Sequence, residues 1–392
     1  MNCRKLIGSI LLLLASVCVQ AQGTFVIEGK VSNVKEGVCL RLFRMEGDIG
    51  KDIAADTLRG GTFRFEQQTL GEGTDKLVLI ITEGNLYTMA LDLWARPGSH
   101  IKITGDDMLV YTWQVESDIP QQHIRQLFVD DSRELWNEYQ QNDIQEKRLY
   151  DRCRSKDITD EMKKDLRAQG EKLSELNKGI QTRIDAKIIK RMKQLPVDDV
   201  WMGELEKLSI DVKYNPDYPY RREVTELYNS LSEEQRKTDK ALDILSYLAP
   251  PDAANLGEKA ADDDLFDLQG NVHHLSDFKG KPVLIDFWSR GCGPCIMALP
   301  EMKEISKKYE GRLVVVSLSI DNKTNWEIAS RHHEITWWNL NDLKGNHGLY
   351  AKYDSGAIPR YVFLSSEGEV QEMWSGYGKG SLLEKLEKLM KD

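Results

Sequence analysis

The sequence predicts a multidomain chain with three parts: a small antiparallel β domain, a helical middle region and a C-terminal α/β domain. Three observations support this division of the 392 residues. The spacing of apolar residues changes from alternation to a helical period near residue 119. Strand and helix patterns alternate from about residue 251 onward. Within that last part, the motif Cys292-Gly-Pro-Cys295 closely follows an apolar strand pattern. A chain of this length exceeds one ordinary core, so several domains are expected.

Residues 1–21 are expected to be a cleaved secretory signal. Arg4 and Lys5 give a positive start, an apolar run covers Leu6–Val17, and Val19-Gln20-Ala21 offers small residues at a cleavage position. The run is too short for a comfortable membrane span. A lipid anchor at Cys18 is the alternative, but the residue before it fits a lipobox poorly. We therefore expect a periplasmic or cell-envelope protein without a lipid anchor.

Residues 22–118 are expected to form a sandwich-like β domain or an open barrel. Short alternating runs recur there, separated by clusters rich in glycine and aspartate. These runs are Thr24–Ile27, Val38–Phe43, Thr62–Phe65, Leu77–Ile81, Met89–Trp94 and His100–Ile103. Regularly spaced short strands are typical of small antiparallel β structures.

Residues 119–250 are expected to be helical. Apolar residues recur there at spacings of three, four or seven, which places them on one helix face that we interpret as core or helix–helix contact. This stripe consists of Leu166, Leu173, Leu176, Ile180, Ile184, Ile188 and Met192. Ser232-Glu-Glu-Gln235 has the pattern of a capping box and predicts the start of another helix.

Residues 251–392 are expected to form the α/β domain, after a linker that begins Ala249-Pro-Pro. Continuous apolar strand patterns alternate with helical ones, which implies a sheet covered on both faces. The expected strands are Pro282–Trp288, Leu313–Ile320, Thr336–Asn339, Arg360–Leu364 and Val370–Trp374. The expected helices are Cys292–Tyr309, Asn325–His332, Gly348–Tyr353 and Ser381–Met390.

Charge and cysteine content restrict the class of function. The net charge is −10, and no basic block is interleaved with aromatic residues, so nucleic acid is not an expected partner. After the signal, no segment is long and apolar enough to span a membrane. Besides the motif, Cys39 and Cys153 remain, which is too few for a disulfide-stapled scaffold. We expect isolated thiols there, although a Cys39–Cys153 bridge stays open.

Cys292 and Cys295 are the residues expected to carry the chemistry. Two thiols three residues apart at a helix start lie on one face and can close a small disulfide ring. The unpaired N–H groups and partial positive charge of the helix N-terminus stabilise a thiolate. Cys292, which comes first and is nearest solvent, is therefore the expected nucleophile. Cys295, one turn further in, is expected to resolve the mixed disulfide.

Metal and haem sites are the alternative uses of such a cysteine pair. Zinc needs four ligands, the chain has no second cysteine pair, and His273-His274 is a loose candidate at best. Haem attachment needs a histidine after the second cysteine, where Ile296 stands. We therefore expect neither a metal nor a cofactor.

Asp286 is a carboxylate inside an otherwise apolar strand pattern, six residues before Cys292. Burial disfavours its ionised form and should raise its pKa, so that it can take and return a proton near neutral pH. The alternative is a hydrogen-bonded structural aspartate or a helix cap. We expect a catalytic role.

From about residue 255 to the end, the chain resembles the thioredoxin superfamily. Val283–Trp288 leads into the cysteine pair, and Pro300 follows five residues after Cys295. Ala357-Ile-Pro359 then precedes Tyr361–Leu364, at the place where thioredoxins carry a cis-proline. The resemblance implies a thioredoxin-like fold.

Further features narrow the resemblance to the TlpA/ResA-type exported thiol-disulfide oxidoreductases. An extra helix and strand lie around Trp326–Leu340, and the chain has an export signal. The front half resembles the β domain and helical spacer that precede such domains in Bacteroidetes-type proteins, and the flanking pattern overlaps with AhpC/TSA-related proteins. The active-site surface departs from thioredoxin at Gly291 and Ile296, and Arg360 stands where threonine is common. Ala298 stands where some ResA-like relatives carry a glutamate, so partner choice cannot be copied from thioredoxin.

The resemblance also implies a partner-binding surface. Pro359 would be cis and would face the disulfide, and Ile358 would offer its main-chain groups to an extended partner segment. Trp288, Gly293 and Pro294 are expected beside the cysteines as further contacts.

We interpret the chain as a thiol-disulfide oxidoreductase, and more narrowly as a disulfide reductase. Its expected partners are protein thiols and disulfides of the periplasm, with a membrane thiol donor of the DsbD type to recharge it. One alternative is a peroxiredoxin-like peroxidase, whose reactive cysteine usually follows a threonine by three residues; only Ser289 approximates this. The other alternative is a non-enzymatic binding or assembly protein of the cell envelope.

Overall fold

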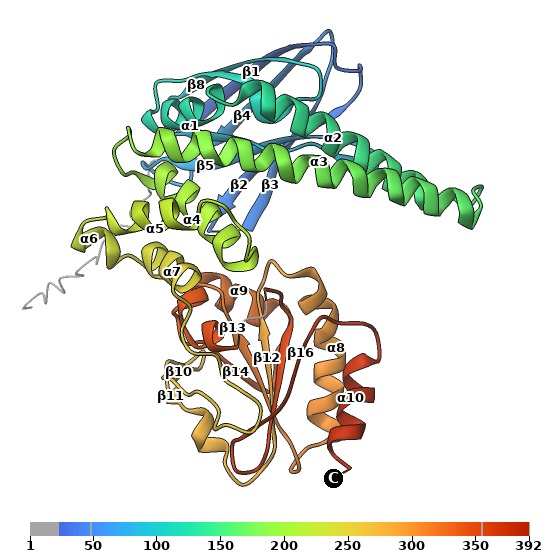
Figure 1. The fold of residues 1–392 in the computed structure, drawn as a ribbon, viewed down its shortest axis with the longest axis vertical. Coiled ribbons are helices and arrows are strands. Elements are labelled where there is room, and N and C mark those ends of the chain that lie inside the picture. The colour runs from blue at the N-terminus through green and yellow to red at the C-terminus, as the bar shows by residue number, and fades with distance from the viewer. Residues whose placement is uncertain (1–22, 48, 354–355, 392) are drawn as a thin grey trace, which may run out of the picture.

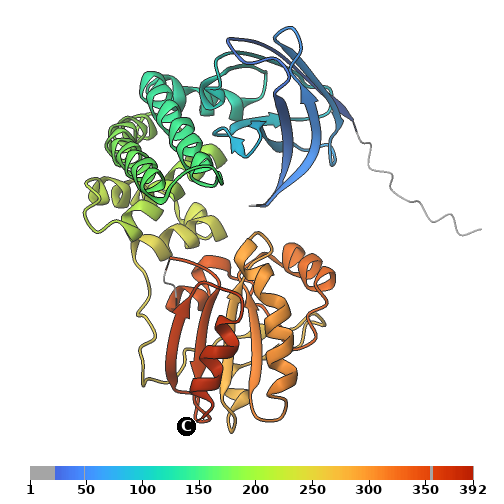
Figure 2. The same ribbon diagram turned by 90° about the vertical axis from the view of Figure 1, so that its right-hand side faces the viewer.

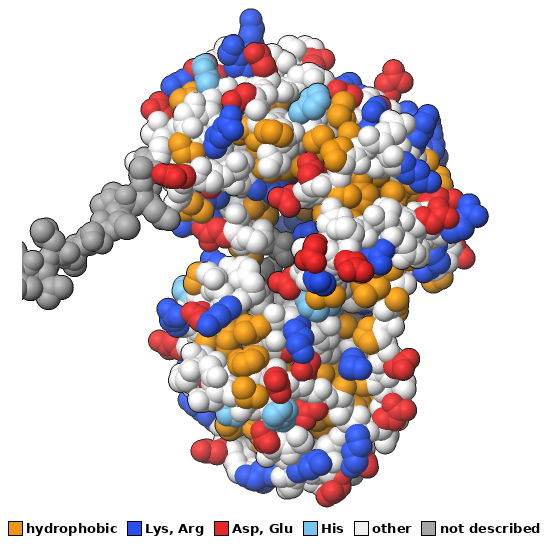
Figure 3. Space-filling view, turned by 90° about the vertical axis from the view of Figure 1, so that its left-hand side faces the viewer, with side chains coloured by type: hydrophobic (Ala, Val, Ile, Leu, Met, Phe, Trp, Pro, Cys, Tyr) orange, Lys and Arg blue, Asp and Glu red, His pale blue; other side chains and the backbone are white. Residues whose placement is uncertain are grey.

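The computed structural model of the protein describes residues 23–47, 49–353 and 356–391. The expected signal sequence and Cys18 lie outside the described residues. The β region and the helical region lie together, and the C-terminal region lies beyond helices α4 to α7 (Figure 1). The molecule narrows between these two parts (Figure 3). Acidic and basic side chains are interspersed on the face that this figure shows.

The β region consists of two sheets that share one core, in which Phe25 and Ile27 meet Leu40 and Leu42. One sheet has the order β4-β1-β8-β9, and the other has the order β3-β2-β5-β6 with β7 also paired to β5. The strands are β1 (Thr24–Ser32), β2 (Cys39–Glu46), β3 (Ile49–Thr57), β4 (Thr62–Gln68), β5 (Asp75–Glu83), β6 (Leu86–Tyr87), β7 (Leu91–Ala95), β8 (His100–Asp106) and β9 (Gln114–Glu116).

The prediction of a purely antiparallel β domain is wrong for one pair of strands. β1 and β8 run parallel, with Ile27 opposite Ile101. Alternation of apolar residues is the same for either strand direction, and the long connection between these strands allows a parallel pairing. β3 was also missed, because Ile49-Gly-Lys-Asp-Ile-Ala-Ala-Asp-Thr57 has no regular alternation of apolar and polar residues.

The helical region packs around a second core, which also takes in Trp94 of β7. Its last helices lie between the long α2–α3 pair and the C-terminal region (Figure 1). The helices are α1 (Pro120–Asp130), α2 (Arg133–Cys153), α3 (Asp160–Met192), α4 (Asp199–Tyr214), α5 (Arg221–Asn229), α6 (Glu233–Arg236) and α7 (Asp239–Leu248). The predicted capping box is present, with Ser232 and Gln235 bonded reciprocally at the start of α6.

The apolar stripe on α3 is a core face only along its second half. Ile180, Ile184, Ile188 and Met192 are buried in the helical core. Leu176 is 52 % exposed, so the prediction that the whole stripe forms core or helix–helix contact is wrong there. The next residue, Asn177, is buried and bonds Asn142 and the backbone of Tyr139 on α2, so Leu176 lies at the edge of the face that α3 turns toward α2.

The C-terminal region is built on a five-stranded sheet with the order β14-β13-β12-β15-β16. β12, β13 and β14 are parallel to one another, whereas β15 and β16 are antiparallel to their neighbours. The elements are β10 (Leu265–Phe266), β11 (Val272–His273), β12 (Val283–Trp288), α8 (Gly293–Lys308), β13 (Val314–Ser319), α9 (Lys323–His332), β14 (Trp338–Leu340), β15 (Arg360–Leu364), β16 (Val370–Ser375) and α10 (Ser381–Leu389).

Both faces of this sheet are covered, as the continuous apolar strand patterns predicted. Leu284 and Tyr361 pack with α8 and α10 on one face (Figure 2). Ile285 and Phe287 pack on the other face against Tyr350 and neighbouring side chains. The expected helix over 348–353 is instead a short 3₁₀ turn, Leu349–Lys352. The extra helix and strand of the sequence pattern are α9 and β14, which extend the sheet beside β13.

Glu301 of α8 fixes the start of α10. Its carboxylate is buried and accepts hydrogen bonds from the backbone N–H groups of Gly380 (2.9 Å) and Leu383 (2.8 Å). The hydroxyl of Tyr377 donates to it as well, at 3.0 Å. A carboxylate at this place satisfies unpaired N–H groups and complements the positive end of the helix. The bond network therefore fixes two helices on the same face of the sheet.

Glu301→Gln should lower the free energy of unfolding by about 1–3 kcal/mol, because an amide turns donor hydrogens toward groups that themselves donate. Urea unfolding followed by circular dichroism measures this loss. Glu304→Gln is the matched control, because Glu304 lies on the same helix and is exposed. Its effect should stay within about 0.5 kcal/mol. Equal losses for the two variants would contradict the proposed cap.

Candidate redox site

The cysteine pair lies at the junction of β12 and α8. Trp288 ends β12, and Cys292 is the residue immediately before α8. Pro294 lies in the first turn of α8, where a backbone N–H has no acceptor within the helix, so proline's lack of an N–H costs no hydrogen bond. The backbone N–H of Cys295 donates to Sγ of Cys292 at 3.1 Å. The first cysteine therefore satisfies one of the unpaired N–H groups of the helix start.

Cys292 and Cys295 are joined by a disulfide bond. Cys292 is half-buried, whereas Cys295 is only 2 % exposed. Gly293 and Pro294 are exposed beside the first cysteine, and the side chain of Met297 on the next turn is 61 % exposed. A partner can therefore reach the sulfur of Cys292 far more readily than that of Cys295.

The loop before β15 meets the disulfide. The Ile358–Pro359 peptide bond is cis, as predicted, and Pro359 is buried. The carbonyl oxygen of Ile358 lies 3.6 Å from Sγ of Cys292, and the Ile358 side chain is half-buried. Residues 66 positions apart in the chain are thus brought together at the first cysteine.

Trp288 does not lie on the partner-facing surface. Its side chain is fully buried and packs in a cluster with Cys295, Trp326 and Ala329. The expectation that Trp288 contacts a partner is therefore wrong, because the β12 alternation directs its ring into the interior. The ring instead packs in the same buried cluster as Cys295.

Asp286 lies on the face of the sheet that α8 covers. Side chains alternate along β12, so Asp286 shares a face with Leu284, which packs against α8, and with Trp288, which packs against Cys295. Its carboxylate is 2 % exposed. Oδ2 accepts a hydrogen bond from the hydroxyl of Ser317 at 3.1 Å, and Oδ1 has no partner among the described residues.

Burial raises the pKa of Asp286 to about 7, and the Ser317 hydrogen bond only partly opposes this shift. Desolvation penalises the ionised carboxylate, and no cation is among the causes that would compensate it. The group is therefore divided between its protonated and ionised forms near neutral pH. This agrees with the pKa expected from a carboxylate in an apolar strand.

Three side chains around Asp286 were not singled out in the sequence. Ser317 lies opposite Asp286 on β13, and its oxygen also accepts a hydrogen bond from the indole N–H of Trp337 at 2.8 Å. Tyr361 lies opposite Asp286 on β15, and its buried hydroxyl has no partner among the described residues. A polar residue amid the valines of β13 was the one signal that could have identified Ser317.

The remaining candidate ligands do not gather at this site. Cys39 and Cys153 are both free thiols and half-buried. Within residues 23–47, 49–353 and 356–391, no three His, Cys, Asp or Glu side chains form a group that could hold a metal ion. No helix in the same ranges has the length and hydropathy of a membrane span.

Comparison with known proteins agrees with this geometry. Residues 256–373 match the AhpC/TSA family. Thioredoxin-like protein YneN of Bacillus subtilis is 32 % identical over 124 residues, which are 31 % of this chain and 71 % of that protein. Thiol-disulfide oxidoreductase ResA of Geobacillus kaustophilus is 30 % identical over 127 residues, or 32 % of this chain and 71 % of that protein. The chain belongs to the thioredoxin-like thiol-disulfide oxidoreductases.

Solved structures include similar domains. The thioredoxin domain of a thiol-disulfide oxidoreductase from Bacteroides vulgatus is 24 % identical, with 35 % of this chain and 99 % of that one covered and a TM-score of 0.33. The family match lies in the C-terminal region that carries the disulfide. As a thioredoxin-like oxidoreductase, the chain is an enzyme.

The stability of this oxidoreductase should depend on the titration of Asp286. Its folded pKa of about 7 lies above the unfolded value of 3.8. Burial of the neutral acid therefore stabilises the fold fully below pH 3.8, and this contribution is lost as pH rises through 7. Relative to Asp286→Asn, the unfolding free energy of the wild type should fall by up to roughly 1.4 kcal/mol per pH unit between pH 5 and 7.

Chemical unfolding of both oxidised proteins across this pH range measures the difference. Glu310→Gln, which removes an exposed carboxylate of the same region, is the matched control for loss of a charge. A constant difference between wild type and Asp286→Asn would contradict the raised pKa.

Proposed function

We propose that the protein is a disulfide reductase for exported proteins that uses the Cys292–Cys295 dithiol. One observation supports this most directly: an accessible cysteine at a helix start is bonded to a buried one. The buried, protonatable Asp286 on the face of the sheet that α8 covers adds a group for proton transfer. The choice of reduction over oxidation rests on Cys-Gly-Pro-Cys and on the isoleucine before the cis-proline, which resemble the reducing thioredoxins.

The reaction begins from the reduced dithiol. The thiolate of Cys292 attacks one sulfur of a substrate disulfide, the substrate S–S bond breaks, and the departing thiolate takes a proton. The thiol of Cys295 then loses its proton and attacks Sγ of Cys292 in the mixed disulfide. The second substrate thiol leaves with a proton, and the Cys292–Cys295 bond forms. The substrate thus gains two electrons and two protons, and the enzyme dithiol loses them.

The helix start favours the thiolate of Cys292. Its sulfur accepts the N–H of Cys295, and the positive end of α8 lowers the cost of a negative charge there. The buried Cys295 lacks that exposure to solvent and needs a nearby base. Asp286, with a pKa of about 7, is suited to take this proton and return it in the reverse step.

The substrate segment is proposed to lie along Ile358 and over the exposed start of α8. The carbonyl oxygen of Ile358 can accept a backbone N–H from an extended segment while the substrate sulfur faces Cys292. Gly293 and Pro294 have no bulky polar groups and are exposed, so they leave room for such a segment. Pro359 is buried and fixes the loop from beneath.

The enzyme must be recharged by a dithiol donor, for which a membrane protein of the DsbD type is proposed. Location in the periplasm or cell envelope is part of the same proposal and rests on the signal pattern of residues 1–21. We further propose that residues 251–392 act as a domain separate from residues 22–118 and 119–250, because the helical and C-terminal cores divide near the linker at Ala249. The β and helical regions share packing through Trp94 and Ile144.

A peroxiredoxin-like peroxidase is the second candidate, because the matching family is AhpC/TSA. Such an enzyme would oxidise one cysteine with peroxide before it formed a disulfide. Comparison of peroxide consumption with reduction of insulin disulfides separates the two candidates. A binding or assembly role would instead be indicated by partner capture that requires residues 22–250 and survives loss of both thiols.

Cysteine variants test the order of attack. Cys292→Ser should abolish disulfide reduction, because the accessible thiol is lost. Cys295→Ser should accumulate mixed disulfides, because the resolving thiol is lost while Cys292 still attacks. Non-reducing electrophoresis and mass spectrometry of the trapped species measure both outcomes. Equal trapping by the two variants, or full activity of either, would overturn the assignment.

Asp286→Asn should slow the release of the reduced substrate by up to about 100-fold near pH 7, because an amide cannot accept the proton of Cys295. Stopped-flow measurement of the attack and release steps should show the defect mainly in release. Ser317→Ala keeps the carboxylate and removes only its hydrogen-bond donor, so its defect should be smaller. Unchanged release in Asp286→Asn across pH 6–8 would make Asp286 a structural residue.

A further inference from the structure

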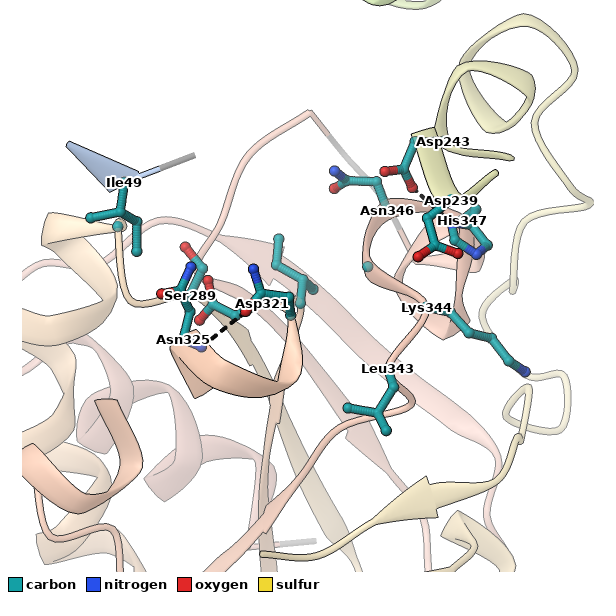
Figure 4. Close-up of a pocket in the computed structure, with 14 residues that line it drawn as sticks. Ile49, Asp239, Asp243, Ser289, Asp321, Asn325, Leu343, Lys344, Asn346 and His347 are labelled. Carbon is teal, nitrogen blue, oxygen red and sulfur yellow. Dashed lines mark hydrogen bonds and ion pairs between the residues drawn. The ribbon is translucent and has the colours of Figure 1, made fainter. Parts of the chain in front are cut away.

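The tip of the β2–β3 hairpin reaches the redox loop from the other end of the chain. We use "hairpin tip" for Glu46 and Gly47 at the end of β2 and Ile49 at the start of β3. Figure 2 shows these strands pointing from the β region toward the C-terminal region. In Figure 4, Ile49 lies close to the loop that carries Ser289.

Polar contacts hold the hairpin tip in place. The side-chain amide of Asn325 donates to the backbone oxygen of Glu46 at 3.3 Å. The guanidinium of Arg290 lies 4.0 Å from the Glu46 carboxylate and donates to Oδ1 of Asn325 at 2.8 Å. Because Arg290 is two residues before Cys292, the hairpin tip is tied to the redox loop itself. The backbone N–H of Arg290 donates to the carboxylate of Asp321, which fixes the redox loop to the segment that follows β13.

An apolar contact lies closer still to the reactive cysteine. A Cβ placed on Gly291 would lie 3.7 Å from Cγ1 of Ile49, which is ordinary van der Waals contact. Gly291 directly precedes Cys292. A side chain from the β region, more than two hundred residues earlier in the chain, thus borders the residue before the reactive cysteine.

The hairpin tip also bounds a cavity beside the redox loop. This cavity has a volume of about 250 Å³ and is lined by Ile49, Ser289, Gly291 and Asn325, with Asp239 of α7 on another side (Figure 4). His347 on its rim is bonded to Asp243 of α7 at 2.8 Å, so the helical region contributes a wall. The cavity beside Gly291 is therefore lined by residues of all three regions of the chain.

We infer that Ile49 at the hairpin tip is a specificity-determining residue that disfavours folded protein disulfides relative to those in small or extended substrates. A folded partner must bring a broad surface over Cys292, and on the Gly291 side that space is taken by the hairpin tip. A narrow segment can approach past Ile358 without displacing it. The inference rests on the proposed function, since it names the substrate class of the same site. Discrimination by a clash against the wrong partner is a general route to specificity.

The test varies the size of the side chain at position 49 in the full-length protein. Ile49→Ala should raise kcat/KM for insulin, a folded disulfide protein, roughly threefold or more, and Ile49→Trp should lower it by a similar factor. With 5,5′-dithiobis(2-nitrobenzoic acid), a small disulfide, each variant should stay within about twofold of the wild type. The measured quantity is the ratio of kcat/KM for insulin to kcat/KM for the small disulfide. General destabilisation cannot raise this ratio in one variant and lower it in the other.

Tyr87→Ala is the matched control. Tyr87 is an exposed aromatic residue of the same sheet, but it pairs with Thr82 at the end of β5 that lies opposite the start of β2, away from the hairpin tip. Its ratio should equal that of the wild type. An unchanged ratio in both Ile49 variants, or a fall with alanine, would overturn the inference alone. Failure of the wild type to reduce either disulfide would overturn the proposed function as well.

Discussion

The burial of one carboxylate in the central strand is the constraint on which the proposed chemistry depends. Asp286 takes a position that alternation along β12 would otherwise give to an apolar side chain, and its ionised form has no cationic neighbour to compensate it. The same alternation puts Trp288 under the inner cysteine. A strand that serves as the middle of the core thus also carries a carboxylate whose pKa burial raises to about 7. Its ionised form is therefore unfavourable to the fold, whereas the proposed proton transfer needs that form.

Local patterns in the sequence were enough to predict the centre of the site. The cysteine spacing, the carboxylate within the apolar strand, and the proline before β15 each lie within a few residues of the element that positions them. Their placement depends on strand alternation and helix starts, which are local properties. The exposure of Trp288 was misjudged, since closeness in sequence to a reactive residue does not decide which way a side chain points.

Other features could not have been predicted, because they depend on residues far apart in the chain. The parallel pairing of β1 with β8 is compatible with the same alternation as an antiparallel one. The approach of Ile49 to Gly291 joins two regions that carry no shared sequence pattern. The exposure of Leu176, beside the buried Asn177, follows from which edge of the α3 face packs against α2. In each case the local pattern was correct, but the tertiary arrangement determined which strand, loop or helix the element packs against.

The hydrogen bond from Trp337 to Ser317 has a consequence for how such enzymes can diverge. Trp337 belongs to the segment between α9 and β14, and its indole N–H donates to the hydroxyl of Ser317. That hydroxyl in turn donates to the carboxylate of Asp286. Substitutions in this added segment can therefore alter the basicity of the carboxylate while the dithiol motif stays intact. Evolution thus has a peripheral position from which to adjust the proton affinity of Asp286, and with it the proposed proton transfer, without changing the cysteine pair.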